Sequence, residues 1–127
     1  MPYKVLVVDD EPSVRDLFKD LLIKEKYSVQ CASSGEEALG IIRREDFDIV
    51  LLDIKLSSMS GFETLKKIKQ VKPSLIVIMT TGFGYDEVLI AKSKDLGCSG
   101  YIGKNIPTYE IMKNFRLFAQ IAKETKG

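Results

Sequence analysis

The chain has 127 residues, which is the length of one domain. Its 19 lysines and arginines nearly balance its 18 aspartates and glutamates, and the net charge is +1 at pH 7, which argues against a direct nucleic-acid partner. The two cysteines form no CxxC pair, so the sequence offers no zinc or redox motif. No apolar run approaches the ~18 residues of a membrane-spanning helix. We therefore expect a cytoplasmic protein with no signal peptide and no membrane partner.

Short apolar runs alternate with stretches of helical periodicity along the whole chain. The run 47–52 stands out because it is mostly apolar, does not alternate and ends abruptly in Asp53. Such a run is typical of a parallel strand that is covered on both faces. In chain order, we predict strand 5–8, helix 12–26, strand 27–32, helix 34–45, strand 47–52, helix 62–71, strand 75–79, helix 85–96, strand 100–103 and a last helix that begins at 107 or 108 and reaches at least 122.

Several helix boundaries carry their own sequence signals. Ser34 and Glu37 are spaced as a capping box at the start of the second helix. Gly97 stands where a glycine ends a helix in the left-handed conformation. The residues that we expect to face inward on the helix 85–96 are Val88, Leu89 and Ala91.

The alternation of strands and helices predicts an α/β fold, a single doubly wound parallel sheet of five strands with five helices on its two faces. Parallel strands deliver the residues at their carboxyl ends to one edge of the sheet, where ligands bind in open α/β folds. The residues at these ends are Asp9 and Asp10, Asp53, Thr80 and Thr81, and Lys104.

Together these side chains suit phosphate and metal chemistry. Hard cations such as Mg²⁺ take carboxylate and carbonyl oxygens, a lysine supplies positive charge, and a threonine supplies a hydroxyl donor. Each residue alone also has an ordinary explanation: acids before Pro12 can cap a helix, threonines fill strands, and lysines lie on surfaces. Only their coincidence at one edge favours a reactive site.

Four motifs surround these strand-end residues. They are Val7-Val8-Asp9-Asp10-Glu11-Pro12, Asp48-Ile49-Val50-Leu51-Leu52-Asp53 with Gly61-Phe62-Glu63, Ile78-Met79-Thr80, and Gly97-Cys98-Ser99-Gly100-Tyr101-Ile102-Gly103-Lys104. By these motifs the chain resembles the receiver domain of two-component response regulators, of the chemotaxis-regulator type, and the likeness covers residues 1–127. The resemblance implies a flavodoxin-like sheet with strand order 2-1-3-4-5.

The resemblance also implies a role for each site residue. Asp53 would accept a phosphoryl group from a sensor histidine kinase or a phosphotransfer protein. Thr80 and Lys104 would contact the phosphoryl oxygens, and Tyr101 would be the switch residue. The metal ligands for Mg²⁺ would be Asp9, Asp10, Asp53 and the backbone carbonyl of Lys55.

The sequence departs from the family pattern near the phosphoryl site. Lys104 is followed by Asn105 where the family usually has proline, and Ser57 replaces another family proline. If Thr80 contacts the phosphoryl group, Thr81 stands where alanine or glycine is common, and we expect it, with Gly82, to control the access of water to the phosphorus. Thr81 is also a second candidate, beside Thr80, for the hydroxyl that contacts the phosphoryl oxygens. Neither Lys55 nor Gly82 offers a carboxylate or amide to orient that water, so a long-lived phosphoryl group is expected.

The resemblance implies a phosphorelay receiver that catalyses its own phosphoryl transfer and slow dephosphorylation and is not a turnover enzyme. Its readout surface, and the face of a potential homodimer, would be the fourth helix, fifth strand and fifth helix. Two alternatives stay open. A haloacid-type phosphatase also uses a strand-end aspartate, but it needs a second acid where this chain has Lys55. A degenerate receiver would act only as a binding module.

Overall fold

The computed structural model describes residues 3–82 and 86–126, and it contains the predicted five strands and five helices. The elements are β1 (Lys4–Val8), α1 (Pro12–Lys24), β2 (Ser28–Ala32), α2 (Gly35–Arg44), β3 (Ile49–Asp53), α3 (Gly61–Val71), β4 (Ile76–Thr81), α4 (Glu87–Asp95), β5 (Gly100–Gly103) and α5 (Thr108–Lys126). The strands form one parallel sheet in the order β2-β1-β3-β4-β5, which confirms the predicted fold and strand order.

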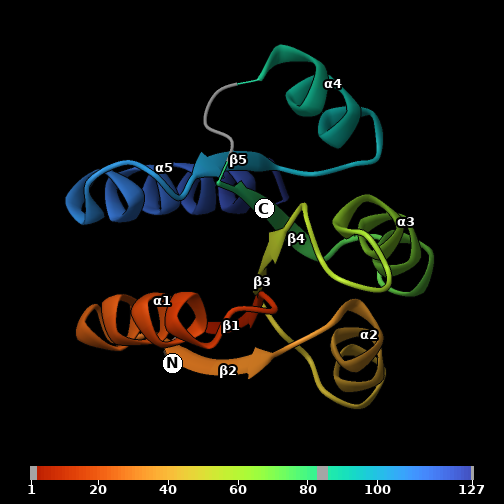
Figure 1. The fold of residues 1–127 in the computed structure, drawn as a ribbon, viewed down its shortest axis with the longest axis horizontal. Helices are drawn as coiled ribbons and strands as arrows, with labels where there is room; N and C mark the ends of the chain where they lie inside the picture. The colour runs from red at the N-terminus through yellow and green to blue at the C-terminus, as the bar shows by residue number, and fades with distance from the viewer. Residues whose placement is uncertain (1–2, 83–85, 127) are drawn as a thin grey trace.

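Helices cover both faces of the sheet (Figure 1), and an apolar cluster of side chains fills the space on each face. Helices α1 and α5 lie on one face, where Phe18 and Phe115 pack on Val7 and Leu51. Helices α2 and α3 lie on the other face and pack on the alternate strand residues. Every residue of β3 is buried, because it lies in the middle of the sheet between the two layers. This burial on both faces is the physical reason for its continuous apolar run.

The helix boundaries follow the predicted signals. Ser34 accepts a hydrogen bond from the Glu37 backbone N–H at 3.1 Å, so the serine half of the predicted capping box is confirmed. The Glu37 carboxylate reaches back to Ser33. Gly97 has a φ of +99°, the left-handed conformation that the end of α4 requires.

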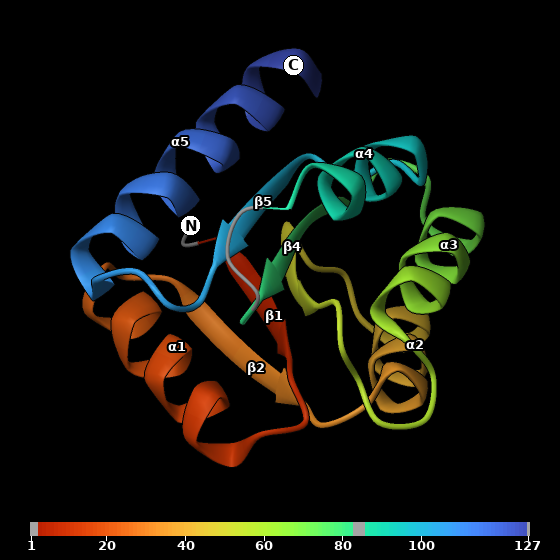
Figure 2. The same cartoon turned by 45° about the horizontal axis from the view of Figure 1, so that its top comes forward.

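The predicted inward face of the fourth helix is wrong for Val88 and Ala91 and right for Leu89, which packs against the core. Val88 is 76% exposed and Ala91 is exposed, whereas Leu89 and Ile90 are half-buried and Ser93 is fully buried. The helix packs only lightly, against β5 at the rim of the molecule, so few of its positions need to be apolar (Figure 2). The predicted start at 85 lies outside the described residues.

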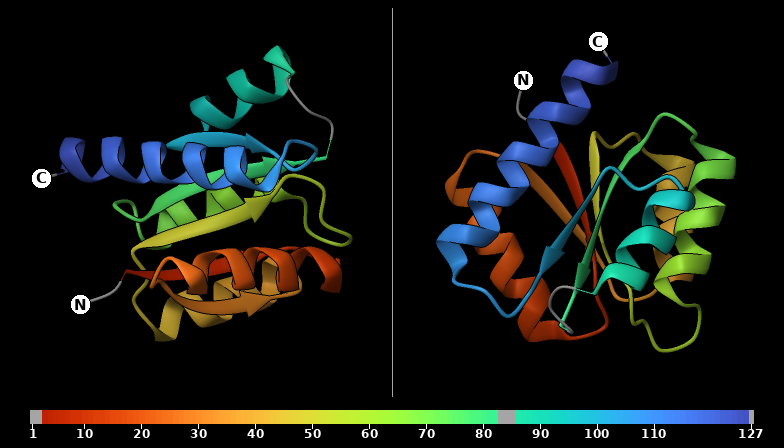
Figure 3. Two further views of the ribbon diagram at one scale, coloured as in Figure 1. Left: turned by 90° about the vertical axis from the view of Figure 1, so that its left-hand side faces the viewer. Right: turned by 90° about the horizontal axis from the view of Figure 1, so that it is seen from above.

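All five strands point toward the same edge, and the opposite edge carries the beginning of β1 and the end of α5 (Figure 3). The turns that lead into α1, α3 and α5 therefore gather at the carboxyl edge of the sheet. Within the described residues, no helix is both long and apolar enough to span a bilayer.

Candidate functional site

The predicted reactive residues meet at the carboxyl edge of the sheet. Asp9 directly follows β1, Asp53 is the last residue of β3, and Lys104 directly follows β5. Asp53 lies opposite Thr80 in the pairing of β3 with β4, so these two residues stand side by side. The sequence thus placed these strand-end residues at a common edge correctly.

Three carboxylates form a cluster at this edge. Asp9, Asp10 and Asp53 each offer an oxygen atom, and these atoms all lie within 4.8 Å of one another. Asp9 and Asp53 are buried, and Asp10 is half-buried. The Lys104 ammonium lies 2.9 Å from Asp9 and 3.3 Å from Asp53, so a single lysine bridges the two buried acids.

Burial and crowding change the proton affinity of these groups. Burial, and after it the negative charge of Asp9, raise the pKa of Asp53 to about 6, although Lys104 acts in the opposite direction. Burial acts to lower the pKa of Lys104, but the hydrogen bond with Asp9 and the charge of Asp53 outweigh it, so the net shift is upward. Lys104 therefore stays cationic, but one lysine faces a cluster of three carboxyl groups.

The β3–α3 loop closes tightly beneath Asp53. The Lys55 backbone N–H donates to Asp53 Oδ1 at 3.4 Å, and the Gly61 N–H donates to the Ile54 carbonyl at 2.8 Å. A Cβ atom on Gly61 would collide with the Asp53 carbonyl oxygen and would lie 2.6 Å from the Ile54 Cα. Glycine is therefore required at this position by the close approach of two backbone segments.

The two neighbouring threonines point to opposite faces of the sheet. Side chains alternate along a strand, so Thr80 shares the α1/α5 face with Asp53 and Lys104. Thr81 shares the other face with Tyr101 and makes a side-chain hydrogen bond with the Tyr101 phenol. Burial raises the pKa of that phenol. Gly82 follows at the exposed end of the strand.

The family model of the response regulator receiver domain matches residues 5–116. The chain belongs to this family. It is a receiver domain of two-component signalling, a class that accepts phosphoryl groups and does not consist of classical turnover enzymes.

Relatives of this receiver domain match over nearly its whole length. Sporulation initiation phosphotransferase F of Bacillus subtilis (strain 168) is 37% identical over 111 residues, which are 87% of this chain and 89% of the relative. A CheY-like receiver domain protein from Methanospirillum hungatei JF-1 has a solved structure with a TM-score of 0.89 and 30% identity, and the match covers 100% of both chains. The response regulator TrrA from Thermotoga maritima, solved in complex with Mg²⁺ and BeF, has a TM-score of 0.82 and 30% identity over 93% of this chain and 99% of that chain.

Two features of this receiver domain escaped the sequence reasoning. Gly61 was noted only as part of a motif, and its close approach to the backbone of β3 becomes visible only in three dimensions. Arg15 was not noted at all, yet its guanidinium donates to the Asp9 carbonyl at 2.8 Å. The available signal was an arginine six positions after the first acid, near the start of the helix that follows β1.

Proposed function

We propose that Asp53 is the phosphoacceptor of this receiver domain and takes its phosphoryl group from a sensor histidine kinase or a phosphotransfer protein. The observation that carries the proposal is the position of the Asp53 carboxylate, which is buried at the end of β3 and lies 3.3 Å from the Lys104 ammonium. The sequence relative that is named a phosphotransferase supports the same role.

In the proposed reaction, a carboxylate oxygen of Asp53 attacks the phosphorus of a phosphohistidine. The new O–P bond forms as the P–N bond breaks, and its electron pair leaves with the histidine nitrogen. With a pKa of about 6, Asp53 is mainly ionised at neutral pH and can act as the nucleophile. Lys104 balances the charge that the phosphoryl group adds, and the Thr80 hydroxyl donates to one of its oxygens.

The acid cluster fits a divalent cation, and we propose Mg²⁺. Carboxylate oxygens are the hard donors that Mg²⁺ prefers, and the three acids come within 4.8 Å of one another. Asp9, Asp10, Asp53 and the Lys55 backbone carbonyl would hold the ion. When bound, Mg²⁺ would neutralise the acids and stabilise the charge on the transferring phosphoryl group. The Mg²⁺ and BeF complex of TrrA supports this assignment.

Tyr101 would carry the signal to a surface made by α4, β5 and α5. A cavity of about 250 Å³ lies on this surface between Ile90 of α4, Tyr101 of β5 and Phe118 of α5. Because Thr81 adjoins Thr80 and is hydrogen-bonded to Tyr101, a movement of Thr80 toward the phosphoryl group would change how Tyr101 packs. The result would be a population shift that favours target binding or a homodimer.

Thr81 and Gly82 would control the access of water to the phosphorus. Thr81 is buried and tied to Tyr101, so it would hold the end of β4 in place. An added Cβ on Gly82 would meet no atom of the described residues, 3–82 and 86–126, within 4 Å. We further propose that residues 1–127 form one cytoplasmic receiver domain without turnover on external substrates, without direct nucleic-acid contact and without a membrane partner.

Labelling with a small phosphodonor tests the function. Acetyl phosphate with Mg²⁺ is expected to add one phosphoryl group to the wild type, and Asp53→Asn should abolish the addition, as read by intact mass spectrometry. Asp20→Asn, an exposed acid on α1, is the matched control and should label normally. Unchanged labelling of Asp53→Asn would refute the assignment. Absence of wild-type labelling would favour a binding module, and continuous turnover of a generic phosphatase substrate would favour an enzyme.

A further inference from the structure

Arg15 contacts the acid cluster through the backbone. Its Nη1 atom donates to the Asp9 carbonyl oxygen at 2.8 Å in a partly buried position. Its own backbone N–H donates to the Glu11 carbonyl at 3.1 Å, so Arg15 lies in the first turns of α1. The proposed phosphoryl transfer gives this guanidinium no role.

Each polar group of Asp9 makes a hydrogen bond. Its N–H donates to the Ala32 carbonyl at 3.2 Å, Oδ1 accepts from the Glu11 N–H at 3.0 Å, and Oδ2 accepts from Lys104 at 2.9 Å. The carbonyl oxygen is the remaining group, and Arg15 occupies it. Asp9 is therefore held from all sides before any cation binds.

Asp10 is held quite differently. Among the described residues, no hydrogen bond or ion pair fixes its carboxylate, although one of its oxygens belongs to the cluster. The position of this carboxylate therefore depends on where the backbone places its Cα and on its two side-chain torsions. The peptide unit that links Asp9 to Asp10 is planar, so fixing the Asp9 oxygen also fixes the plane that contains the Asp10 nitrogen and Cα.

We propose that Arg15 is a positioning residue of the cation site, which holds the Asp10 carboxylate in place for a divalent cation by fixing the Asp9–Asp10 peptide. This inference rests on the proposed Mg²⁺-dependent function. Without the guanidinium, the peptide can rotate, and the apparent affinity for the cation falls with the fraction of molecules in which Asp10 faces the cluster. Residues that orient metal ligands act in this indirect way.

Calorimetric titration of the whole chain with Mg²⁺ alone tests the proposal. Arg15→Gln should weaken Mg²⁺ binding roughly tenfold, and Arg15→Lys, which keeps the charge and one donor, should restore part of the loss. Lys19→Gln is the matched control, because it removes one positive charge from an exposed position one turn further along α1. Its Mg²⁺ affinity should equal that of the wild type. A melting curve of each metal-free variant separates loss of fold from loss of affinity.

Three results would overturn the proposal. The first is an unchanged Mg²⁺ affinity in Arg15→Gln, even with a lower melting temperature, since that pattern indicates a purely structural arginine. The second is an equal loss in Lys19→Gln, which would indicate a general charge effect. The third is a wild type that binds no Mg²⁺, which would also remove the cation site of the proposed function, whereas the first two results would leave that function intact. If Arg15→Gln fails to fold, Arg15→Met, which keeps much of the side-chain length without a donor, is judged by the same criteria.

Discussion

The buried carboxylate of Asp53 makes the stability of the fold depend on pH. It is 3% exposed, lies beside Asp9, and has its pKa raised to about 6. Between its ordinary value of 3.8 and 6, the folded state binds the Asp53 proton more tightly than the unfolded state does, so stability falls as the pH rises through this window. Once the pH is above 6, this loss of folding stability is complete. The Asp53 carboxylate, which we propose as the phosphoacceptor, therefore destabilises the metal-free fold at neutral pH.

Replacing this carboxylate should stabilise the metal-free protein. We expect Asp53→Asn to raise the free energy of unfolding at pH 7.5 by about 2 kcal/mol, because the amide carries no charge to desolvate or to repel Asp9. The gain should vanish near pH 4, where the wild-type carboxyl is also largely protonated in the folded state. Urea unfolding at both pH values measures the difference. An equal gain at both pH values, or an equal gain in the exposed-site control Asp20→Asn, would contradict the electrostatic origin.

Thr81 should lengthen the life of the phosphoryl group. Its side chain and its hydrogen bond with Tyr101 hold the end of β4 next to Thr80, which we expect to restrict the approach of water to the phosphorus. Thr81→Ala should accelerate phosphoryl loss several-fold, which corresponds to roughly 1 kcal/mol of barrier. The decay of labelled protein after donor removal measures the rate.

A buried threonine elsewhere provides the comparison for Thr81→Ala. Thr64 lies inside α3, where its hydroxyl donates to the Ser60 carbonyl at 2.8 Å, so Thr64→Ala should leave the decay unchanged. Equal decay of wild type and Thr81→Ala would remove Thr81 from the control of water access. If Thr81→Ala does accelerate phosphoryl loss, the decay rate of Tyr101→Phe shows whether the acceleration depends on the hydrogen bond between Thr81 and the Tyr101 phenol.

The pair Thr80 and Thr81 marks a limit of prediction from sequence. Both residues are polar, adjacent and at the end of a strand, so composition cannot decide which one faces Asp53. The decision depends on the pairing register, which places Thr80 opposite Asp53 and leaves Thr81 on the face of Tyr101. Arg15 escaped for a similar reason, because its contact is with a backbone oxygen that no side-chain pattern reveals.

The β3–α3 loop depends on Gly61 in a way that can be tested. Gly61→Ala should lower the free energy of unfolding by about 2 kcal/mol, because the added methyl group meets rigid backbone at Asp53 and Ile54. It should also slow labelling by acetyl phosphate, because the displaced backbone carries the Asp53 carboxylate. Urea unfolding and the initial labelling rate measure both effects.

Gly40 is the matched control for this substitution. It lies within α2, where an added Cβ would meet only Arg44 Nη1 at 3.7 Å. Gly40→Ala should therefore stabilise the protein, by up to about 1 kcal/mol, through the better helix propensity of alanine. A Gly61→Ala variant with unchanged stability and labelling rate would show that the loop can relax around the methyl group.

The elements differ in how well their sequences specify them. Strands β1, β3 and β4 were predictable because burial on both faces requires unbroken apolar runs. Helix α2 was predictable because Ser34 caps its first turn, and α3 because its buried residues Leu65 and Ile68 recur at helical spacing. The inward face of α4 was not, because this helix buries only Ser93 and its apolar residues carry no clear period. A helix that packs lightly leaves little trace in the hydrophobic pattern.

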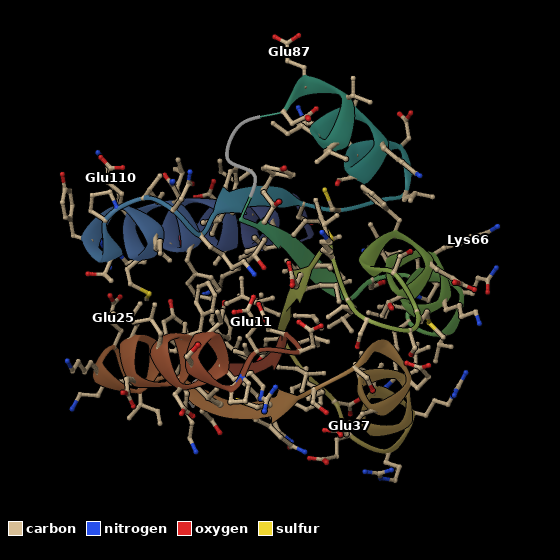
Figure 4. All side chains as sticks on the ribbon, viewed as in Figure 1. Glu11, Glu25, Glu37, Lys66, Glu87 and Glu110 are labelled. Carbon is tan, nitrogen blue, oxygen red and sulfur yellow. The ribbon has the colours of Figure 1, made fainter. Side chains whose placement is uncertain are left out.

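Helices α1 and α5 are held to each other more firmly than α4 is held to the rest of the molecule. Helices α1 and α5 are joined by the ion pair of Glu25 with Arg116 at 2.6 Å, and Figure 4 shows Glu25 on the side of α1 that faces α5. Helix α4, by contrast, stands at the rim, and Glu87 at its start points away from the body (Figure 4). A rearrangement that follows phosphorylation is therefore easier at α4 than at the α1/α5 layer.

This asymmetry predicts where a phosphorylated molecule gains partners. Mg²⁺ with beryllofluoride, a stable phosphoryl mimic, should strengthen self-association or target binding through the α4, β5 and α5 surface, because Tyr101 lies on it and is linked to Thr81. Light scattering and a pull-down with and without beryllofluoride measure the change. Leu117→Glu on α5, at a side chain that is 53% exposed, should abolish the gain, whereas Ile23→Glu on α1, at a side chain that is 49% exposed, should preserve it. Two results would show that partners bind another surface. One is that beryllofluoride binds but neither measurement changes, and the other is that Ile23→Glu alone abolishes the gain.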